Sequence, residues 1–297
     1  MSGFRLKKEE SEDEGIRRVA HGRVEDAVRL LRDEDADPVE AVHEARKDLK
    51  KLRATLKLVR PVIGDDLYRR ENERFRGAGQ TLSDVRDAQV RAETVGGLAE
   101  RFADDPPPGG WSAVRTPLAG DDASGNGELE SLRDRTATEI ELGDEAIEDW
   151  PLHADGFELL RPGLRRAYSR GRRRYREALD DPSDEALHEW RKRSKDLWYH
   201  LRLVHRGWPE VIEATADEAH ELSDRIGDDH DLAVLVGYLD EADPPLTSEQ
   251  LGHVRTLVAR RRQELQGEAF AYGERLFAEK PKRFIERMEG YWEARRL

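Results

Sequence analysis

The sequence predicts an all-α protein that consists of two linked helical bundles. Its composition favours helix-forming residues such as Ala, Leu, Glu and Arg, and alternating β-branched runs of the kind found in strands are hard to find. Proline and glycine divide the chain into stretches of helical length. In addition, a motif of 17 residues occurs twice, once in each half of the chain.

The breaks between the expected helices are marked by clusters of Pro, Gly and Asp. They are expected at residues 60–65, 104–110, 120–127, 150–162, 181–182, 207–209 and 243–245. Stretches of about 15–30 residues lie between them, so that four helices per half is the simplest count. We therefore divide the chain into an N-terminal half, residues 1–155, and a C-terminal half, residues 156–297, which together form one domain.

The internal repeat is clearest between residues 43–59 (HEARKDLKKLRATLKLV) and 188–204 (HEWRKRSKDLWYHLRLV), where nine of 17 positions are identical. Two weaker pairs occur in the same order. Residues 82–90 align with 226–234, which matches Asp84 with Asp228 and Asp87 with Asp231, and Gly15-Ile-Arg-Arg matches Gly163-Leu-Arg-Arg. We expect the two halves to superpose, with His43 and His188 in equivalent places.

Each copy of the motif carries its basic residues along one side of a helix and its apolar residues along the neighbouring side. In the first copy the basic stripe contains His43, Arg46, Lys47, Lys50, Arg53 and Lys57. In the second copy it contains His188, Arg191, Lys192, Lys195 and Arg202, together with Trp198 and Tyr199. A solvated helix face usually mixes charges of both signs, whereas cations of one sign repel each other unless an anion lies across them.

Such a row of cations suits a linear polyanion, because Lys supplies mobile point charges and Arg supplies bidentate donors for phosphate oxygens. Six of the ten lysines in the chain lie within the two motifs. Additional candidate cations are Arg165, Arg172 and Lys280. The alternative is that the stripes pack against acidic faces, with Asp84, Asp87, Asp228 and Asp231 orienting the cations.

The two histidines at the start of the motifs leave two interpretations open. Near pH 6.5 each would gain a proton and strengthen anion binding, or each would stay neutral and bond a neighbour. A metal site is not expected on them, because HEARK and HEWRK differ from the zinc motif H-E-x-x-H and the neighbouring cations would repel a metal ion.

Charge and composition narrow the function classes. The net charge of −13 opposes general binding to nucleic acids. The chain has no Cys, which excludes disulfides and thiolate metal sites. No apolar run has the length of a membrane span, and the N-terminus lacks the apolar region of a signal peptide. We therefore expect a cytoplasmic protein without a membrane partner.

The motifs resemble those of the CHAD family, the conserved histidine α-helical domain. The resemblance rests on His43-x-x-Arg46-Lys47-x-x-Lys50, its second copy from His188 to Lys195, and the segments 82–87, 227–231 and 273–282. It implies two four-helix bundles related by a pseudo-two-fold axis, with the basic helices facing a central cavity. It also implies binding of inorganic polyphosphate and, in some members, association with polyphosphate granules. One departure is Trp198, which stands where the first copy has Arg53.

The resulting hypothesis is a polyphosphate-binding protein that has no catalytic activity and no cofactor. The alternative is an enzyme that acts on phosphoanhydrides or a metal-dependent phosphatase. Phosphoryl transfer normally requires carboxylates that hold Mg²⁺, and the two aligned Asp pairs are the only candidates. Family members also occur fused to CYTH triphosphate-hydrolysing domains, but residues 139–143 (EIELG) lack the Lys of the E-x-E-x-K motif of those domains.

Overall fold

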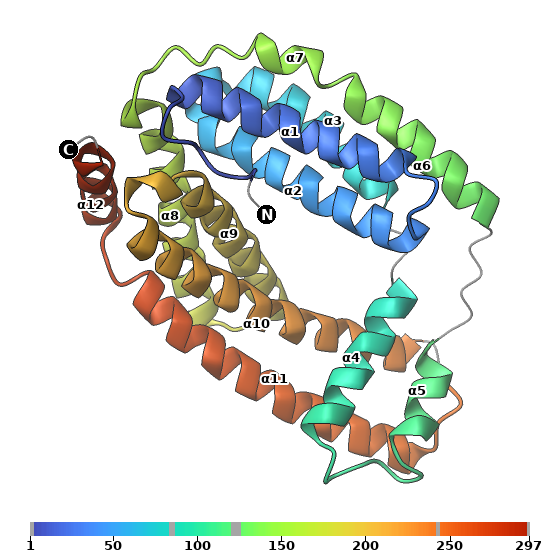
Figure 1. The fold of residues 1–297 in the computed structure, drawn as a ribbon. Helices are drawn as coiled ribbons and strands as arrows, with labels where there is room; N and C mark the ends of the chain where they lie inside the picture. Colours follow the sequence, from blue (N-terminus) through green and yellow to red (C-terminus); the bar gives the residue numbers. More distant parts are fainter. Residues whose placement is uncertain (1–2, 83–86, 120–125, 242–243, 296–297) are drawn as a thin grey trace.

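The computed structural model describes residues 3–82, 87–119, 126–241 and 244–295, and every regular element in these ranges is a helix (Figure 1). The first half contains α1 (Glu12–Arg32), α2 (Pro38–Ile63), α3 (Asp65–Thr81), α4 (Asp87–Arg101), α5 (Trp111–Ala119), α6 (Asn126–Glu141) and the short α7 (Glu145–Glu148). The second half contains α8 (Phe157–Asp180), α9 (Asp184–Leu203), α10 (Pro209–Glu241), α11 (Ser248–Leu276) and α12 (Pro281–Ala294), with a 3₁₀ turn at His205–Gly207. The prediction of an all-α fold is confirmed.

Local sequence explains where several of these helices begin. Ser11 and Glu14 form a capping box at the start of α1, and Thr247 and Gln250 form another at the start of α11. The side chain of Asp37 accepts hydrogen bonds from two backbone N–H groups of α2, and Pro38 occupies the first turn of this helix. These caps satisfy backbone donors that the first turn of a helix leaves unpaired.

The two copies of the repeated motif lie on α2 and α9, which pack against each other and against α8. The Nε2–H of buried His200 on α9 donates to the carbonyl oxygen of Ala54 on α2, over 2.9 Å. At Gly163, α8 approaches α2 so closely that an added Cβ would lie 1.7 Å from the carbonyl oxygen of Leu58. The motif helices therefore form the centre of the molecule.

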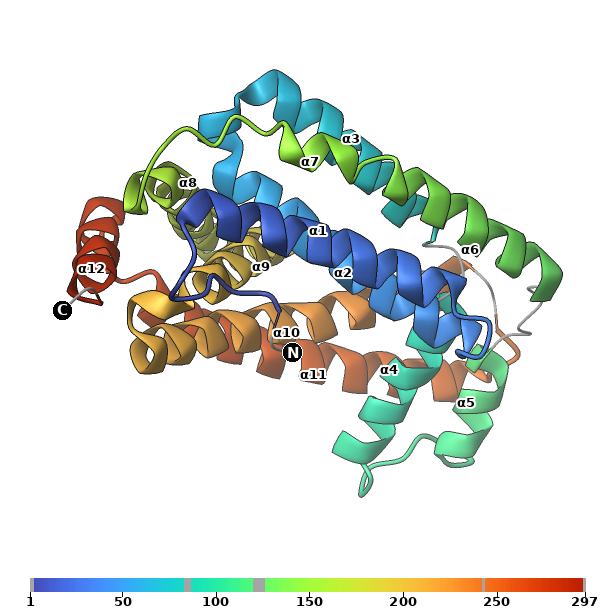
Figure 2. The ribbon, with the colours of Figure 1, turned by 45° about the horizontal axis from the view of Figure 1, so that its top comes forward.

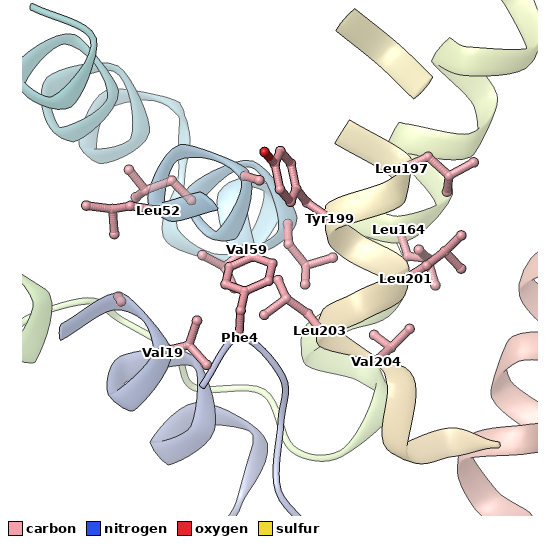
Figure 3. Close-up of a cluster of buried hydrophobic side chains, with 14 of the residues drawn as sticks. Phe4, Val19, Leu52, Val59, Leu164, Leu197, Tyr199, Leu201, Leu203 and Val204 are labelled. Atoms are coloured by element: carbon pink, nitrogen blue, oxygen red, sulfur yellow. The ribbon is translucent and has the colours of Figure 1, made fainter. Parts of the chain in front are cut away.

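The main hydrophobic core surrounds these central helices and includes the extended segment that precedes α1. Figure 3 shows Phe4 between Val19 of α1 and Tyr199 of α9, and the two aromatic rings meet edge to face at 5.7 Å. Leu6 of the same segment is 1% exposed, and its N–H donates to the carbonyl oxygen of Leu203. The N-terminal segment is therefore an integral part of the fold.

A second, smaller core lies at the far end of α10 and α11, where α4 and α5 pack against them (Figures 1 and 2). Val95 and Leu98 of α4 meet Leu235 of α10 and Leu257 of α11 in this core. Helices from the N-terminal half thus complete a bundle with helices from the C-terminal half.

The helix boundaries differ from the sequence expectation at three points. The break expected at 150–162 ends early, because α8 begins at Phe157 and contains Pro162. The predicted break at 60–65 narrows to Gly64, which has a positive φ of 84°, because α2 continues through Pro61 to Ile63. The simple count of four helices per half is also wrong. In the C-terminal half, α10 runs unbroken for 33 residues. In the N-terminal half, the region that aligns with α10 is divided between α3 and α4, and α5, α6 and α7 are additional. In the described part of the chain, no helix is long and apolar enough to span a membrane.

Candidate functional site

The predicted division of each motif helix into a basic and an apolar side is present in the structure. Ala45, Leu49, Leu52, Leu56 and Val59 of α2 are all at most 1% exposed. In α9, the corresponding Trp190, Ser194, Leu197 and Leu201 are fully buried, as is Val204 at its C-terminal cap. The basic residues of both stripes are exposed or partly buried, with Lys50 and Lys192 among the exposed ones. Burial of the apolar side fixes the direction in which the cations project.

Each stripe contains the same Glu–Lys pair, three residues apart on the helix. Glu44 bonds Lys47 on α2, and Glu189 bonds Lys192 over 2.7 Å on α9. The pKa of each glutamate is lowered. At Glu44, burial tends to raise the pKa, but the interaction with Lys47 outweighs burial. At Glu189, the hydrogen bond to Lys192 is the largest influence on the pKa. One cation in each stripe is therefore partly neutralised by its own helix, whereas the alternative interpretation expected acidic faces of neighbouring helices.

Lys195 of α9 lies within electrostatic range of the stripe on α2. Burial lowers the pKa of its ammonium group, and the charge of Arg191 lowers it further. Asp224 and Asp231 of α10 act in the opposite direction, and Lys47 of α2 adds to the lowering. Cations from both copies of the motif therefore lie within electrostatic range of each other, which raises the local demand for an anion.

Two other stripe residues near the start of the motif on α9 contact α10. The Nε of Arg191 donates to the carbonyl oxygen of Ser223 on α10 over 3.3 Å. The rings of His188 and His230 lie 4.7 Å apart. Burial, together with the charge of Lys192, lowers the pKa of His188, which favours the neutral ring at neutral pH. His43 lies at the equivalent place on α2, with its Nε2 4.0 Å from Glu44.

The C-terminal ends of the two stripes have different surroundings. Arg53 of α2 donates to the side-chain oxygen of Asn72 on α3 over 3.1 Å, and Lys57 bonds buried Asp196 of α9 over 2.6 Å. On α9, the guanidinium group of Arg202 lies over the rings of Phe4 and Trp198, at 5.5 and 5.3 Å from their centroids. Trp198 also contacts His220 of α10 at 3.9 Å between ring centroids.

Three candidate cations lie elsewhere. Arg165 is exposed on α8. Arg172 lies on the same face of that helix, about two turns further on, and donates to the carbonyl oxygen of Phe277 at the C-cap of α11 over 2.9 Å. Lys280 is exposed at the N-cap of α12. Arg172 is therefore engaged at the end of α11.

Two buried carboxylates were missed by the sequence analysis. Asp48 of α2 bonds Arg23 over 2.8 Å and Lys51 over 2.7 Å, and Asp196 of α9 bonds Lys57 and Arg193 over 2.6 and 2.9 Å. Burial alone would raise the pKa of Asp196, but its two cationic partners outweigh burial and lower it. In each motif the Asp precedes a Leu of the buried side, and this place in the sequence indicates an inward-facing ion pair.

The aspartates of the second aligned segment lie on α10 beside the basic stripe. Burial, followed by the charge of Asp224, raises the pKa of Asp228, while Asp224 bonds His220 over 2.6 Å. Asp84 and the side chain of Asp87 lie outside the described residues. Among the described residues, no group of three or more His, Asp or Glu side chains is arranged to hold a metal ion.

The motifs, their helical setting and their order agree with the comparison to known families. The CHAD domain model matches residues 18–240, which includes both motif helices and most of α10. A comparison with curated proteins gives no match. Since the family model covers well over half of the sequence, this chain belongs to the CHAD domain family.

Proposed function

We propose that this protein binds inorganic polyphosphate, without catalysis, along the basic stripes of α2 and α9. In this proposal the two halves are duplicated bundles, and the stripes face one shared cavity into which the polymer fits. Lys50 and Lys195 are the central contacts, and polyphosphate granules are candidate sites of action. The observation that carries the proposal is the packing of the two motif helices against each other, which leaves Lys195 of α9 within electrostatic range of Lys47 of α2.

The energetics favour an extended phosphate polymer over a small ligand. Neighbouring cations on a helix face lie about 5–6 Å apart, so that a chain with a charge at every phosphate can contact several of them at once. Each charge-assisted hydrogen bond contributes about 1.5–3 kcal/mol. Binding along two stripes would also relieve the repulsion between Lys195, Arg191 and Lys47.

The carboxylates of α10 support binding without catalysis, because they already serve the basic stripe. Asp224 bonds His220 and interacts with Lys195 and Arg191. Asp231 also interacts with Lys195. Carboxylates used in this way orient cations and leave fewer oxygen ligands for the Mg²⁺ that phosphoryl transfer requires.

The first test replaces Lys50 and Lys195 with Gln and measures affinity for medium-chain polyphosphate. We expect the double variant to bind at least roughly tenfold more weakly, because two charge-assisted contacts are lost. The matched control replaces exposed Lys8 and Arg135 with Gln, which changes the net charge by the same amount, from −13 to −15. Circular dichroism checks that both variants fold.

Salt dependence and competitors sharpen the test. For the native chain we expect the logarithm of the association constant to fall linearly with the logarithm of salt concentration, by about 0.7 per neutralised phosphate if polyphosphate behaves as a single strand. Single-stranded DNA and heparin should bind more weakly than polyphosphate. Equal affinity of the Lys50/Lys195 variant and its control would refute the site, and phosphate release dependent on Mg²⁺ would favour the enzyme alternative.

A further inference from the structure

A second cationic feature lies at the junction of α2, α8 and α9, on the side of α9 that carries Arg193, Asp196 and His200. It is a pocket of about 40 Å³. Its lining consists of Lys57, Arg60, Tyr68, Gly163, Arg166, Ala167, Arg170, Arg193, Asp196 and His200. Five of these residues are cations and one is a carboxylate. The lining is therefore strongly positive in a protein whose net charge is negative.

The carboxylates near the pocket do not neutralise it. Asp196 already bonds Lys57 and Arg193, and Asp65 at the rim bonds Arg60 over 2.8 Å. Arg166 lies within electrostatic range of Asp65, and Arg170 within that of Asp196, but neither arginine forms an ion pair with a described residue. The Nε–H group of Arg193 is buried and lacks a hydrogen-bond partner in the described part of the chain. A buried donor without a partner is costly and points to a missing acceptor.

The aligned position in the first half of the chain shows what such a groove accepts. The repeat matches Arg166 with Arg18, and there the chain supplies its own anion. Glu10, from the segment before α1, accepts hydrogen bonds from both Nε and Nη2 of Arg18, each over 2.6 Å. Phe4 and Leu6 of the same segment fill the neighbouring apolar space and are 4% and 1% exposed. Arg18 therefore has an internal anion, whereas Arg166 forms no ion pair with a described residue.

We propose that the pocket at the α2–α8–α9 junction is an oxyanion site that takes one phosphate group, bonded by Arg166, Arg170 and Arg193. The shared chemistry is a phosphate group with two negative charges, which either free orthophosphate or the terminal group of a phosphate chain provides. The site goes beyond the proposed function, because its arginines lie outside the stripes and only Lys57 belongs to both features.

Size and charge select this class of ligand. A volume of about 40 Å³ corresponds to roughly three water molecules, which is the scale of one phosphate group and too small for a sugar or a base. Glu10 satisfies Arg18 with a single charge, whereas the open pocket has four more cations than carboxylates in its lining. A dianion therefore matches the pocket better than one carboxylate does. Arginine guanidinium groups provide the planar donors that bind phosphate oxygens in pairs.

The test measures binding of orthophosphate and of tripolyphosphate to the full chain by titration calorimetry. The variant Arg166→Gln/Arg170→Gln removes two cations from the pocket, one exposed and one partly buried, so that the fold should tolerate both changes. The matched control is Arg173→Gln/Arg176→Gln, which removes two exposed cations from the same helix outside the pocket. We expect the pocket variant to lose at least roughly tenfold in affinity and the control to keep the native affinity.

The two probes identify the source of the phosphate group. Loss of orthophosphate binding alone identifies free phosphate as the ligand, and loss of tripolyphosphate binding identifies a chain end; either result supports the pocket. Native affinity of the pocket variant for both probes, or equal losses in the pocket variant and the control, would overturn it. The Lys50/Lys195 variant tests the stripes separately, so that failure of one proposal leaves the other standing.

Discussion

The two motif helices present the same charges outward and opposite charges inward. Position by position, Arg46, Lys47 and Lys50 of α2 match Arg191, Lys192 and Lys195 of α9. On the inner side the signs reverse: Asp48 and Lys51 of α2 align with Arg193 and Asp196 of α9. Each inner pair forms an ion pair within its own helix, over 2.7 Å in α2 and 2.9 Å in α9.

This difference separates a structural requirement from a ligand requirement. A buried ion pair needs opposite charges close together, and either order of the two residues satisfies it. The outer stripe keeps its positive sign at every matched position except Trp198, which aligns with Arg53, although an acidic or mixed face would be equally soluble. The comparison therefore favours an external anion as the reason for the outer cations.

The largest expected effect comes from the glycines that the repeat aligns on α8 and α1. In Gly163→Ala the new Cβ would lie 1.7 Å from the backbone oxygen of Leu58, so that α2 and α8 must move apart. In Gly15→Ala the nearest atoms belong to the side chains of Leu6 and Glu10, at 2.6 and 2.7 Å, and side chains can shift. We expect Gly163→Ala to lower the free energy of unfolding by more than about 3 kcal/mol and Gly15→Ala by about 1 kcal/mol.

Urea denaturation of the two variants measures this difference. Alanine has a higher helix propensity than glycine by about 1 kcal/mol, and this gain applies equally to both positions, so that the contrast isolates the contact. Similar stabilities of the two variants would mean that the α2–α8 contact is not closer than its counterpart at α1.

The choice of the binding face on α8 shows where the sequence was sufficient and where it was not. The sequence predicted the all-α fold and both basic stripes, because apolar residues at helical spacing fix which side is buried. On α8 it selected Arg165 and Arg172, but Arg166 and Arg170 line the pocket. Small residues at Gly163 and Ala167 mark the face of α8 that lies close to other helices, and this signal was present in the sequence.

Other features follow from long-range packing that no local pattern contains. The docking of α4 and α5 on α10 and α11 joins residues far apart in the chain, such as Val95 and Leu235. Phe4 and Leu6 lie in a short segment with charged neighbours, and their packing against α1 and α9 makes their burial favourable. Hydrophobic periodicity identifies a buried face but does not identify the helix that covers it.

A smaller effect concerns the position where α2 has Thr55 and α9 has His200. Burial lowers the pKa of His200 to about 4, against an ordinary value of 6.5. Between pH 6.5 and about pH 4, His200 is protonated in the unfolded chain but neutral in the folded chain. The neutral ring therefore contributes to stability above pH 6.5, and that contribution is lost as the pH falls from 6.5 toward 4. The full loss is roughly 3 kcal/mol, at about 1.36 kcal/mol per pKa unit.

The variant His200→Gln tests this effect, since its amide can still donate to the carbonyl oxygen of Ala54 but cannot titrate. We expect the free energy of unfolding of the variant to depend less on pH between 4 and 6.5 than that of the native protein, as measured by urea denaturation at several pH values. The same slope in both proteins would show that other groups, such as the carboxylates, account for the acid sensitivity.

The smallest effect compares Arg18, which has an internal anion, with Arg166, which forms no ion pair with a described residue. Glu10→Gln removes the carboxylate that bonds Arg18 through two nitrogen atoms. Because the side chains of Glu10 and Arg18 are 14% and 31% exposed, solvent screens part of the interaction, and we expect the free energy of unfolding to fall by about 1 kcal/mol at pH 7.

Arg166→Gln should leave the free energy of unfolding unchanged in phosphate-free buffer. Adding orthophosphate should stabilise the native chain and the Glu10→Gln variant but should stabilise Arg166→Gln less, because a ligand that binds only the folded state shifts the unfolding equilibrium toward it. If phosphate stabilises all three proteins equally, Glu10 and Arg18 form only a local ion pair, and this pair does not indicate which ligand binds the pocket at Arg166.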